Sequence, residues 1–165
     1  MIRAAIAASM ALALAGCATT PAASPHPEAR AYVPSITAMA DVDAALARAD
    51  GSGKRVLLVL GANWCHDSRA LAGWLETPRF AALTAARYEV VFVDVGMPQT
   101  GAGVNLDVPR RFGLAEMKGT PALLVLTPEG KPVNLDTAAG WRNAASRSEE
   151  AILTELASLA DAPAA

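Results

Sequence analysis

The stretch that decides the expected fold is Val56-Leu57-Leu58-Val59-Leu60-Gly61-Ala62-Asn63-Trp64-Cys65-His66-Asp67-Ser68. Its first five residues are branched and apolar, which predicts a strand buried on both faces, and a glycine-containing break follows. A helix is expected next, over Arg69 to Glu76, because apolar residues recur there at i, i+3 and i+4. Cys65 therefore falls at or just before the first turn of a helix. Free N–H groups and the positive end of the helix dipole favour a thiolate at such a position.

The immediate neighbours of Cys65 are not those of a packed core position. Trp64 precedes it, and the polar residues His66, Asp67 and Ser68 follow it. This pattern favours a reactive or ligand-binding thiol over an inert buried one. Ser68 lies one helical turn further on, so its hydroxyl is expected within hydrogen-bonding reach of the sulfur. His66 is either a charge partner of the sulfur or a solvent-facing side chain, and the sequence leaves both open.

The N-terminus has the pattern of an export signal. Arg3 is followed by the apolar run Ala4 to Ala15, which suits a signal peptide over residues 1–16 and is too short to span a membrane. Leu14-Ala15-Gly16-Cys17 resembles the bacterial lipobox, which implies that Cys17 is lipidated and begins the mature chain. Ala18 in the next position then suggests the outer membrane, facing the periplasm. The alternative is an ordinary secretory signal in which Cys17 has no role.

Residues 17–34 are rich in proline and alanine, which predicts an extended tether between the lipid and the domain. His26 lies in this tether and is expected to be solvated, because a single histidine supplies only one metal ligand. If Cys17 carries lipid, Cys65 is the only free thiol in an oxidising compartment. Any covalent chemistry of Cys65 must then involve another molecule.

The length and composition of the chain limit the classes of function that it can have. The 165 residues suffice for one domain, expected over 35–165, and 14 basic against 16 acidic residues give a net charge of −2. No basic stripe appears, so nucleic acid is not an expected partner. No His, Cys and Asp residues occur with metal-ligand spacing, so neither a metal site nor a cofactor is expected.

The remaining periodicities predict alternating helices and strands. A mixed sheet of about four strands with helices on both faces accommodates them, which is an α/β fold. The capping box Ser146 to Glu149 is expected to begin the last helix. In chain order we expect a helix over 41–49, a strand over 56–60, helices over 69–76 and 79–86, a strand over 88–94, a long loop over 96–107, a short helix over 109–112, a strand over 122–126, an edge strand over 132–135 and the last helix.

This order resembles the thioredoxin superfamily over roughly residues 41–160. The residues that carry the resemblance are Trp64 to Ser68 and the motif Gly119-Thr120-Pro121. The resemblance implies a three-layer α/β/α fold in which Pro121 is cis and lies beside the active-site sulfur, with Thr120 at the edge that binds substrate. Only bonds preceding proline adopt cis at low cost. The alternative is an ordinary trans proline at the start of a strand.

Three departures limit what the resemblance implies. Ser68 replaces the resolving cysteine, so the internal disulfide of a dithiol enzyme cannot form. Val59 replaces a buried acid that helps to deprotonate that second thiol, and Gly73 stands where the family often has a kinking proline. The loop over residues 96–107 is the expected insertion.

Two functions remain open. The first is thiol–disulfide exchange at the membrane surface, in which Cys65 forms mixed disulfides with periplasmic proteins or small thiols and an external thiol resolves them. Trp64, His66 and Ser68 would assist. The second is a binding or assembly module without turnover, which holds a client beside Pro121 or a soft metal through Cys65 and a methionine. The candidate methionines, more simply packing residues, are Met97 and Met117.

Overall fold

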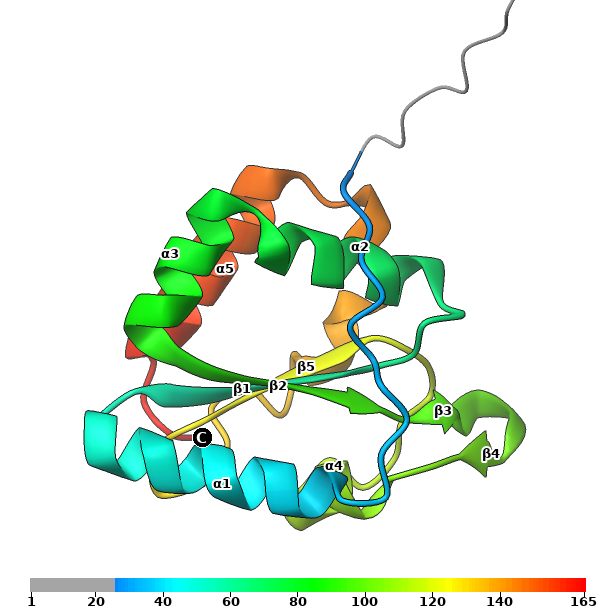
Figure 1. The fold of residues 1–165 in the computed structure, drawn as a ribbon, viewed down its shortest axis with the longest axis horizontal. Helices are drawn as coiled ribbons and strands as arrows, with labels where there is room; N and C mark the ends of the chain where they lie inside the picture. The colour runs from blue at the N-terminus through cyan, green and yellow to red at the C-terminus, as the bar shows by residue number, and fades with distance from the viewer. Residues whose placement is uncertain (1–25) are drawn as a thin grey trace, which may run out of the picture.

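A computed structural model describes residues 26–165, which form a mixed three-stranded sheet between two layers of helices (Figure 1). Strand β1 (Arg55–Gly61) is central; β2 (Tyr88–Asp94) pairs with it in parallel and β5 (Ala122–Leu126) antiparallel. Branched residues dominate all three strands, which suits burial on both faces. The expected mixed α/β architecture is confirmed. The expected signal peptide and the expected lipidation site Cys17 lie outside the described residues.

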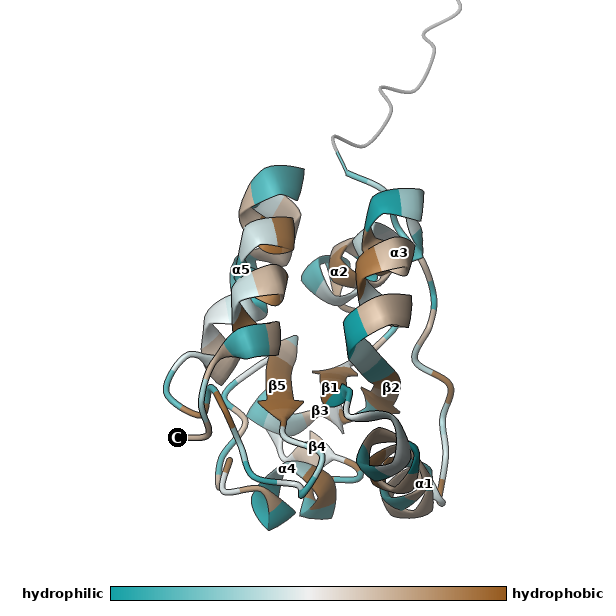
Figure 2. Cartoon of the chain, turned by 90° about the vertical axis from the view of Figure 1, so that its left-hand side faces the viewer, coloured by the Kyte–Doolittle hydropathy of each residue, from teal (hydrophilic) through white to brown (hydrophobic). Residues whose placement is uncertain are grey.

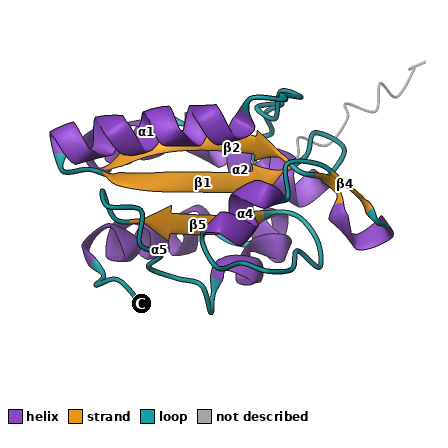
Figure 3. Cartoon of the chain, turned by 90° about the horizontal axis from the view of Figure 1, so that it is seen from below, coloured by secondary structure: helices purple, strands orange, loops and turns teal. Residues whose placement is uncertain are grey.

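The helices cover both faces of the sheet (Figures 1 and 3). One layer holds α1 (Ala38–Ser52) and α4 (Asp107–Arg111). The other holds α2 (His66–Glu76), α3 (Pro78–Arg87), the 3-10 segment η2 (Ala138–Ser146) and α5 (Glu149–Asp161). No helix in residues 26–165 combines the length and apolar character that crossing a membrane requires.

Alternation along β1 divides the core in two. Val56, Leu58 and Leu60 pack toward α1, whereas Leu57 and Val59 pack toward the opposite layer. The strands are accordingly the most uniformly apolar part of the chain in Figure 2. Val59, at the position of the family's buried acid, is thus an ordinary core residue.

The expected fourth strand is not formed. Residues 132–135 contribute only an isolated bridge, between Pro132 and Leu126. The side chain of Asn134 replaces the missing backbone pairing, because its Oδ1 accepts the Val125 N–H at 2.8 Å and its Nδ2 donates to the Leu123 carbonyl at 3.0 Å. A side-chain amide can satisfy both backbone groups, so a paired strand is not needed there.

The expected long loop contains a small hairpin. Strands β3 (Gly96–Met97) and β4 (Ala102–Gly103) pair antiparallel around the 3-10 turn η1 (Pro98–Thr100). Gly101 ends the turn with φ +83°, a conformation that favours glycine. No apolar periodicity marks strands of two residues, which is why the sequence pattern missed them.

The start of the last helix was predicted two residues too early. Ser148 is the N-cap of α5, and its hydroxyl accepts the Ala151 N–H. The Ser146 hydroxyl instead donates to the Asn143 carbonyl at the end of η2. Serine is a preferred N-cap residue, so the sequence alone does not distinguish Ser146 from Ser148. Ser146 is the last residue of η2, a segment that was not predicted, and this leaves Ser148 as the N-cap.

Residues 26–34, expected to be part of a solvated tether, lie against the domain; we call them the strap. In Figure 1 the strap continues from the top of the molecule, beside α2, across to α1. The Ala29 N–H donates to the Arg69 carbonyl at 3.0 Å. Tyr32 is buried, and its ring meets that of Phe92 edge-on at 5.4 Å. The expectation that this part of the chain is a solvated tether is therefore wrong, because the segment is docked on the domain.

The docking of the strap explains Gly73. A Cβ atom on Gly73 would lie 2.5 Å from the Pro27 carbonyl group, so only glycine lets the strap backbone lie directly on α2. Proline and alanine suggested a tether because they carry little apolar surface. The buried Tyr32 ring, the close backbone contact with Gly73 and several hydrogen bonds dock it instead.

Candidate functional site

Cys65 is the N-cap of α2, as the sequence predicted. Its backbone is extended, with φ −81° and ψ 125°, and its carbonyl accepts the Arg69 N–H to begin the helix. Its sulfur makes no capping hydrogen bond, so the first helical N–H groups remain directed toward this end of α2. The residue is 8% exposed, which leaves a narrow window to solvent.

The sulfur of Cys65 lies against the Thr120–Pro121 corner. The peptide bond between these residues is cis, which excludes the trans alternative. The Cys65 Sγ donates to the Thr120 carbonyl at 3.4 Å, so two motifs that lie far apart in the sequence meet in space. The Thr120 hydroxyl is buried and has no partner within residues 26–165.

Ser68 does not make the hydrogen bond to sulfur that was expected. It is fully buried, and its hydroxyl has no partner among the described residues. It faces the end of β1, where a Cβ atom on Gly61 would lie 2.7 Å from the Ser68 Oγ. The Tyr32 hydroxyl donates to the Ser68 carbonyl at 3.2 Å, and burial raises the pKa of Tyr32 above its ordinary value.

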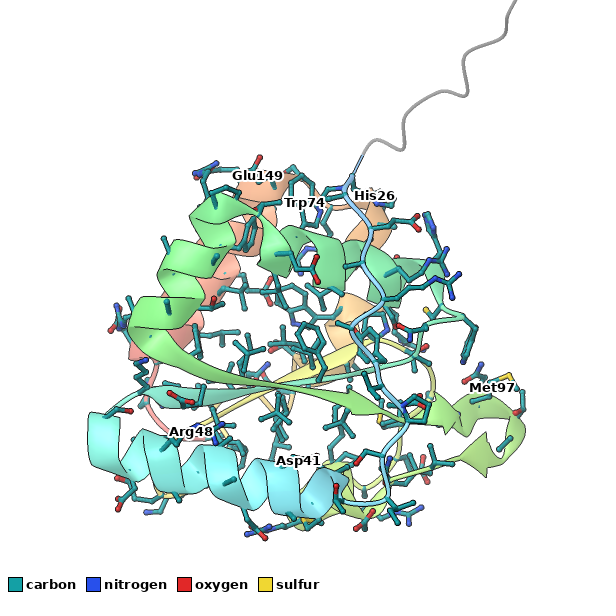
Figure 4. All side chains as sticks on the ribbon, viewed as in Figure 1. His26, Asp41, Arg48, Trp74, Met97 and Glu149 are labelled. Carbon is teal, nitrogen blue, oxygen red and sulfur yellow. The ribbon has the colours of Figure 1, made fainter. Side chains whose placement is uncertain are left out.

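Trp64 supports the inserted hairpin. Its ring is half exposed, and its Nε1–H donates to the Gly96 carbonyl at 3.0 Å. Met97 lies on this hairpin, at the outer edge of the molecule in Figure 4. Met117 is partly buried and packs against the core cluster that α1 shares with the sheet, which favours the packing interpretation of that residue.

His66 and Asp67 point toward other parts of the protein. The Asp67 carboxylate accepts the Ala145 N–H at 2.9 Å, which joins α2 to η2. The His66 Nδ1 lies 3.1 Å from the Glu28 carboxylate, and its Nε2 lies 3.2 Å from the His26 Nε2. His66 is therefore neither a demonstrated partner of the sulfur nor a side chain free in solvent.

His26 is only 6% exposed, so the expectation that it is solvated is wrong. Figure 4 shows it at the upper end of the strap, near α2. No sequence signal predicted its meeting with His66, because the two residues belong to segments whose approach depends on docking of the strap. The separation along the sequence is forty residues.

Arg69 connects the strap to the loop that presents Cys65, a role that the sequence did not indicate. Its Nε donates to Glu28 at 2.9 Å, and one of its terminal nitrogens donates to the carbonyls of Asn63 and Trp64. The hydrogen bond from Arg69 holds the pKa of Glu28 below its ordinary value, against a smaller opposing effect of burial. Asn63 in turn exchanges hydrogen bonds with the Tyr32 backbone.

The surface beside the cis-proline is formed in part by Arg142. This side chain is exposed, and its Cδ would lie 2.9 Å from a Cβ atom on Gly119. Trp141, the neighbouring residue, is fully buried beneath the Arg147 guanidinium and serves the core. Arg142 is therefore positioned to contact a molecule that approaches Pro121.

Known proteins resemble this chain over most of the described residues. A family model described as thioredoxin-like matches residues 37–128, a range that includes both Cys65 and Pro121. Among solved structures, the crystal structure of a disulphide isomerase from Xylella fastidiosa Temecula1 has 33% sequence identity and a TM-score of 0.70. The alignment covers 81% of this chain and 98% of that one. No curated protein matches the chain.

Proposed function

The chain belongs to the thioredoxin-like family, and on that premise we propose that it catalyses thiol–disulfide exchange through the single thiol of Cys65. One observation carries the proposal: the Cys65 sulfur lies at the N-terminus of α2 and 3.4 Å from the Thr120 carbonyl of the cis-proline corner. A helix N-terminus stabilises a thiolate, which is the attacking form.

The proposed reaction conserves thiols and disulfides at each step. The Cys65 thiolate attacks one sulfur of a client disulfide, a mixed disulfide forms, and the other client sulfur leaves as a thiolate. A second thiolate then attacks the client sulfur of the mixed disulfide and releases Cys65. When that second thiolate comes from the client itself, the result is isomerisation. For net reduction, a small thiol instead attacks the Cys65 sulfur of the mixed disulfide and releases the second client thiol, and a second small thiol then frees Cys65, so that the two small thiols leave as a disulfide.

Ser68 favours a reaction completed by an external thiol. It occupies the buried position one turn after Cys65, and a hydroxyl cannot form a disulfide. Isomerisation requires no second thiol of the enzyme, because the number of disulfides in the client is unchanged. The similar solved structure is described as a disulphide isomerase, which agrees with this form of the reaction.

The location and partners of the protein are part of the proposal. Lipid on Cys17 would hold the domain at the outer membrane, and clients would be periplasmic proteins or small thiols. The strap then connects the lipidated end to the helix that bears Cys65. Arg142 and the Thr120 corner would contact the client.

The test measures mixed-disulfide formation by the full chain with Cys17 replaced by serine, so that Cys65 is the only thiol. Glutathione disulfide is added at neutral pH, and intact mass shows whether one glutathionyl group is attached. We expect attachment in the folded protein and its release by reduced glutathione. The matched control Cys65→Ser should remain unmodified.

A second readout separates exchange from binding alone. A substrate protein with scrambled disulfides should regain its native pairing faster with the Cys65 chain than with Cys65→Ser. If Cys65 is modified only after the chain is unfolded, the exchange proposal is wrong and the low exposure of the sulfur favours the binding alternative. If a mixed disulfide forms but no substrate is repaired, isomerisation is wrong and simple exchange is retained.

A further inference from the structure

The two histidines of this sequence lie side by side although forty residues separate them. The Nε2 atoms of His26 and His66 are 3.2 Å apart, and the ring centroids are 4.8 Å apart in an edge-on arrangement. Glu28 completes the cluster, and one ligand atom from each of the three residues lies within 4.8 Å of the others. His26 is buried, whereas Glu28 and His66 reach the surface.

The outer nitrogen of each ring already faces an acceptor. The His26 Nδ1 lies 3.2 Å from the Pro27 carbonyl, and the His66 Nδ1 lies 3.1 Å from the Glu28 carboxylate. A proton on each Nδ1 would serve both acceptors, and in that tautomer each Nε2 offers a lone pair on the side of the other ring. One cation bound by both nitrogens makes that arrangement favourable.

Both ring orientations are those of metal-bound histidines. A ligating histidine usually donates its second N–H to a carbonyl or carboxylate, which fixes the ring and increases its basicity. Two nitrogens bound to one tetrahedral zinc ion, each at about 2.0–2.1 Å, lie about 3.3–3.4 Å apart. The observed separation of 3.2 Å between the Nε2 atoms is close to this value, so little rearrangement is required.

We propose that His26 and His66 bind one zinc ion through their Nε2 atoms. Glu28 orients His66 from the outside, and Arg69 in turn holds Glu28 by the contact at 2.9 Å. The remaining coordination positions face the exposed side of His66, whose side chain is 56% exposed, and water or an external ligand occupies them. This proposal differs from the expectation, drawn from the spacing of residues in the sequence, that the protein has no metal site.

The bound ion would join the strap to the start of α2. His26 belongs to the strap, and His66 is the first residue of α2, directly after Cys65. The strap is already fixed here by the Ala29 hydrogen bond and by its close contact with Gly73. Zinc would therefore strengthen an existing contact, and its binding does not depend on the proposed exchange reaction.

The test measures zinc affinity in the full chain with both cysteines replaced by serine, which removes thiolate ligands. Competition with a chromophoric zinc chelator should give one ion per chain. His26→Gln and His66→Gln should each weaken binding at least tenfold, and Glu28→Gln should weaken it about 10–100-fold through the loss of orientation. Glu76→Gln, an exposed change at the end of α2, is the matched control and should not alter the affinity.

Thermal unfolding supplies a second measurement. Zinc should raise the melting temperature of the cysteine-free chain and leave that of His26→Gln unchanged, because only a folded-state ligand stabilises by mass action. Circular dichroism of each variant shows that it is folded. The proposal is wrong if the parent and both histidine variants bind zinc with equal affinity. It is also wrong if the parent does not bind zinc at micromolar concentrations. Binding that appears only when Cys65 is restored would overturn it as well.

Discussion

Replacing Gly73 by alanine tests whether the strap is docked on α2 as the structure describes. The new methyl group would lie 2.5 Å from the Pro27 carbonyl carbon and oxygen, whereas ordinary contacts begin at 3.4 Å. The strap backbone must therefore move by about 0.9 Å. Its neighbours Ala29 and Tyr32 are anchored by hydrogen bonds, so the movement cannot be absorbed locally.

The expected magnitude follows from two opposing effects. Overpacking of this kind costs about 1–3 kcal/mol, whereas alanine in a helix is favoured over glycine by about 1 kcal/mol. Gly51→Ala is the matched control, since Gly51 lies in α1 and its added methyl would meet nothing within 4 Å. Gly73→Ala should therefore be less stable than Gly51→Ala by about 1–3 kcal/mol.

Thermal unfolding monitored by circular dichroism checks this difference. In a domain of this size, 1 kcal/mol corresponds to about 2–4 °C, so the two variants should melt about 2–12 °C apart. Faster proteolysis within the strap of Gly73→Ala should accompany the lower melting temperature. If both alanine variants stabilise the protein equally, residues 26–32 do not lie on α2, and the zinc site loses its geometric basis.

Three further perturbations test other parts of the structure. In the chain with Cys17 replaced by serine, Ser68→Cys should form an internal disulfide with Cys65 under mild oxidation, because the two positions lie one helical turn apart. A titration of the denatured chain should then show the loss of both thiols. Asn134→Ala should lower the free energy of unfolding by about 2–5 kcal/mol, measured in urea, since two buried backbone groups lose their partner. Burial raises the pKa of Tyr32 and Tyr88, so ultraviolet titration should show no tyrosinate near pH 10 until the chain unfolds, and stability should fall as the pH rises above that value.

The two substitutions have matched controls, and contrary results can be stated for the disulfide and for the tyrosine titration. Ser52→Cys, at the end of α1, should keep its thiol free, and two free thiols in Ser68→Cys would contradict the placement of Ser68 beside Cys65. Asn143→Ala, at an exposed position, should change stability by no more than about 0.5 kcal/mol. Reversible ionisation of a tyrosine in the folded protein near pH 10 would contradict the burial of both rings.

Predictions from local patterns were accurate where the pattern was long. The strands over 88–94 and 122–126 have the predicted bounds, and Cys65 lies at the predicted helix start. Branched apolar runs, helical spacing and glycine breaks are properties of neighbouring residues, so they can be read directly from the sequence. The cis bond at Pro121 was implied only by the resemblance that the motif carries.

The errors concern contacts between distant segments. A strand was predicted over residues 132–135, but the side-chain amide of Asn134 instead pairs with two backbone groups of β5. No periodicity in these residues predicts that contact. The predicted N-cap of α5 was Ser146 and the observed one is Ser148, because Ser146 belongs to the 3-10 segment η2. In both places a tertiary contact decided between alternatives that local propensity treats as equal.

Local patterns in the sequence were enough to predict the three strands of the main sheet, the helix start at Cys65 and the lack of a second thiol near it, because each depends on residues close together in the chain. The folded structure was needed to show that the strap lies on α2 and that His26 faces His66, and it gives the contact of the Cys65 sulfur with Thr120 that the family resemblance implied. Those approaches depend on how the layers pack, and packing is fixed by the shapes of many side chains together, so no local pattern contains it.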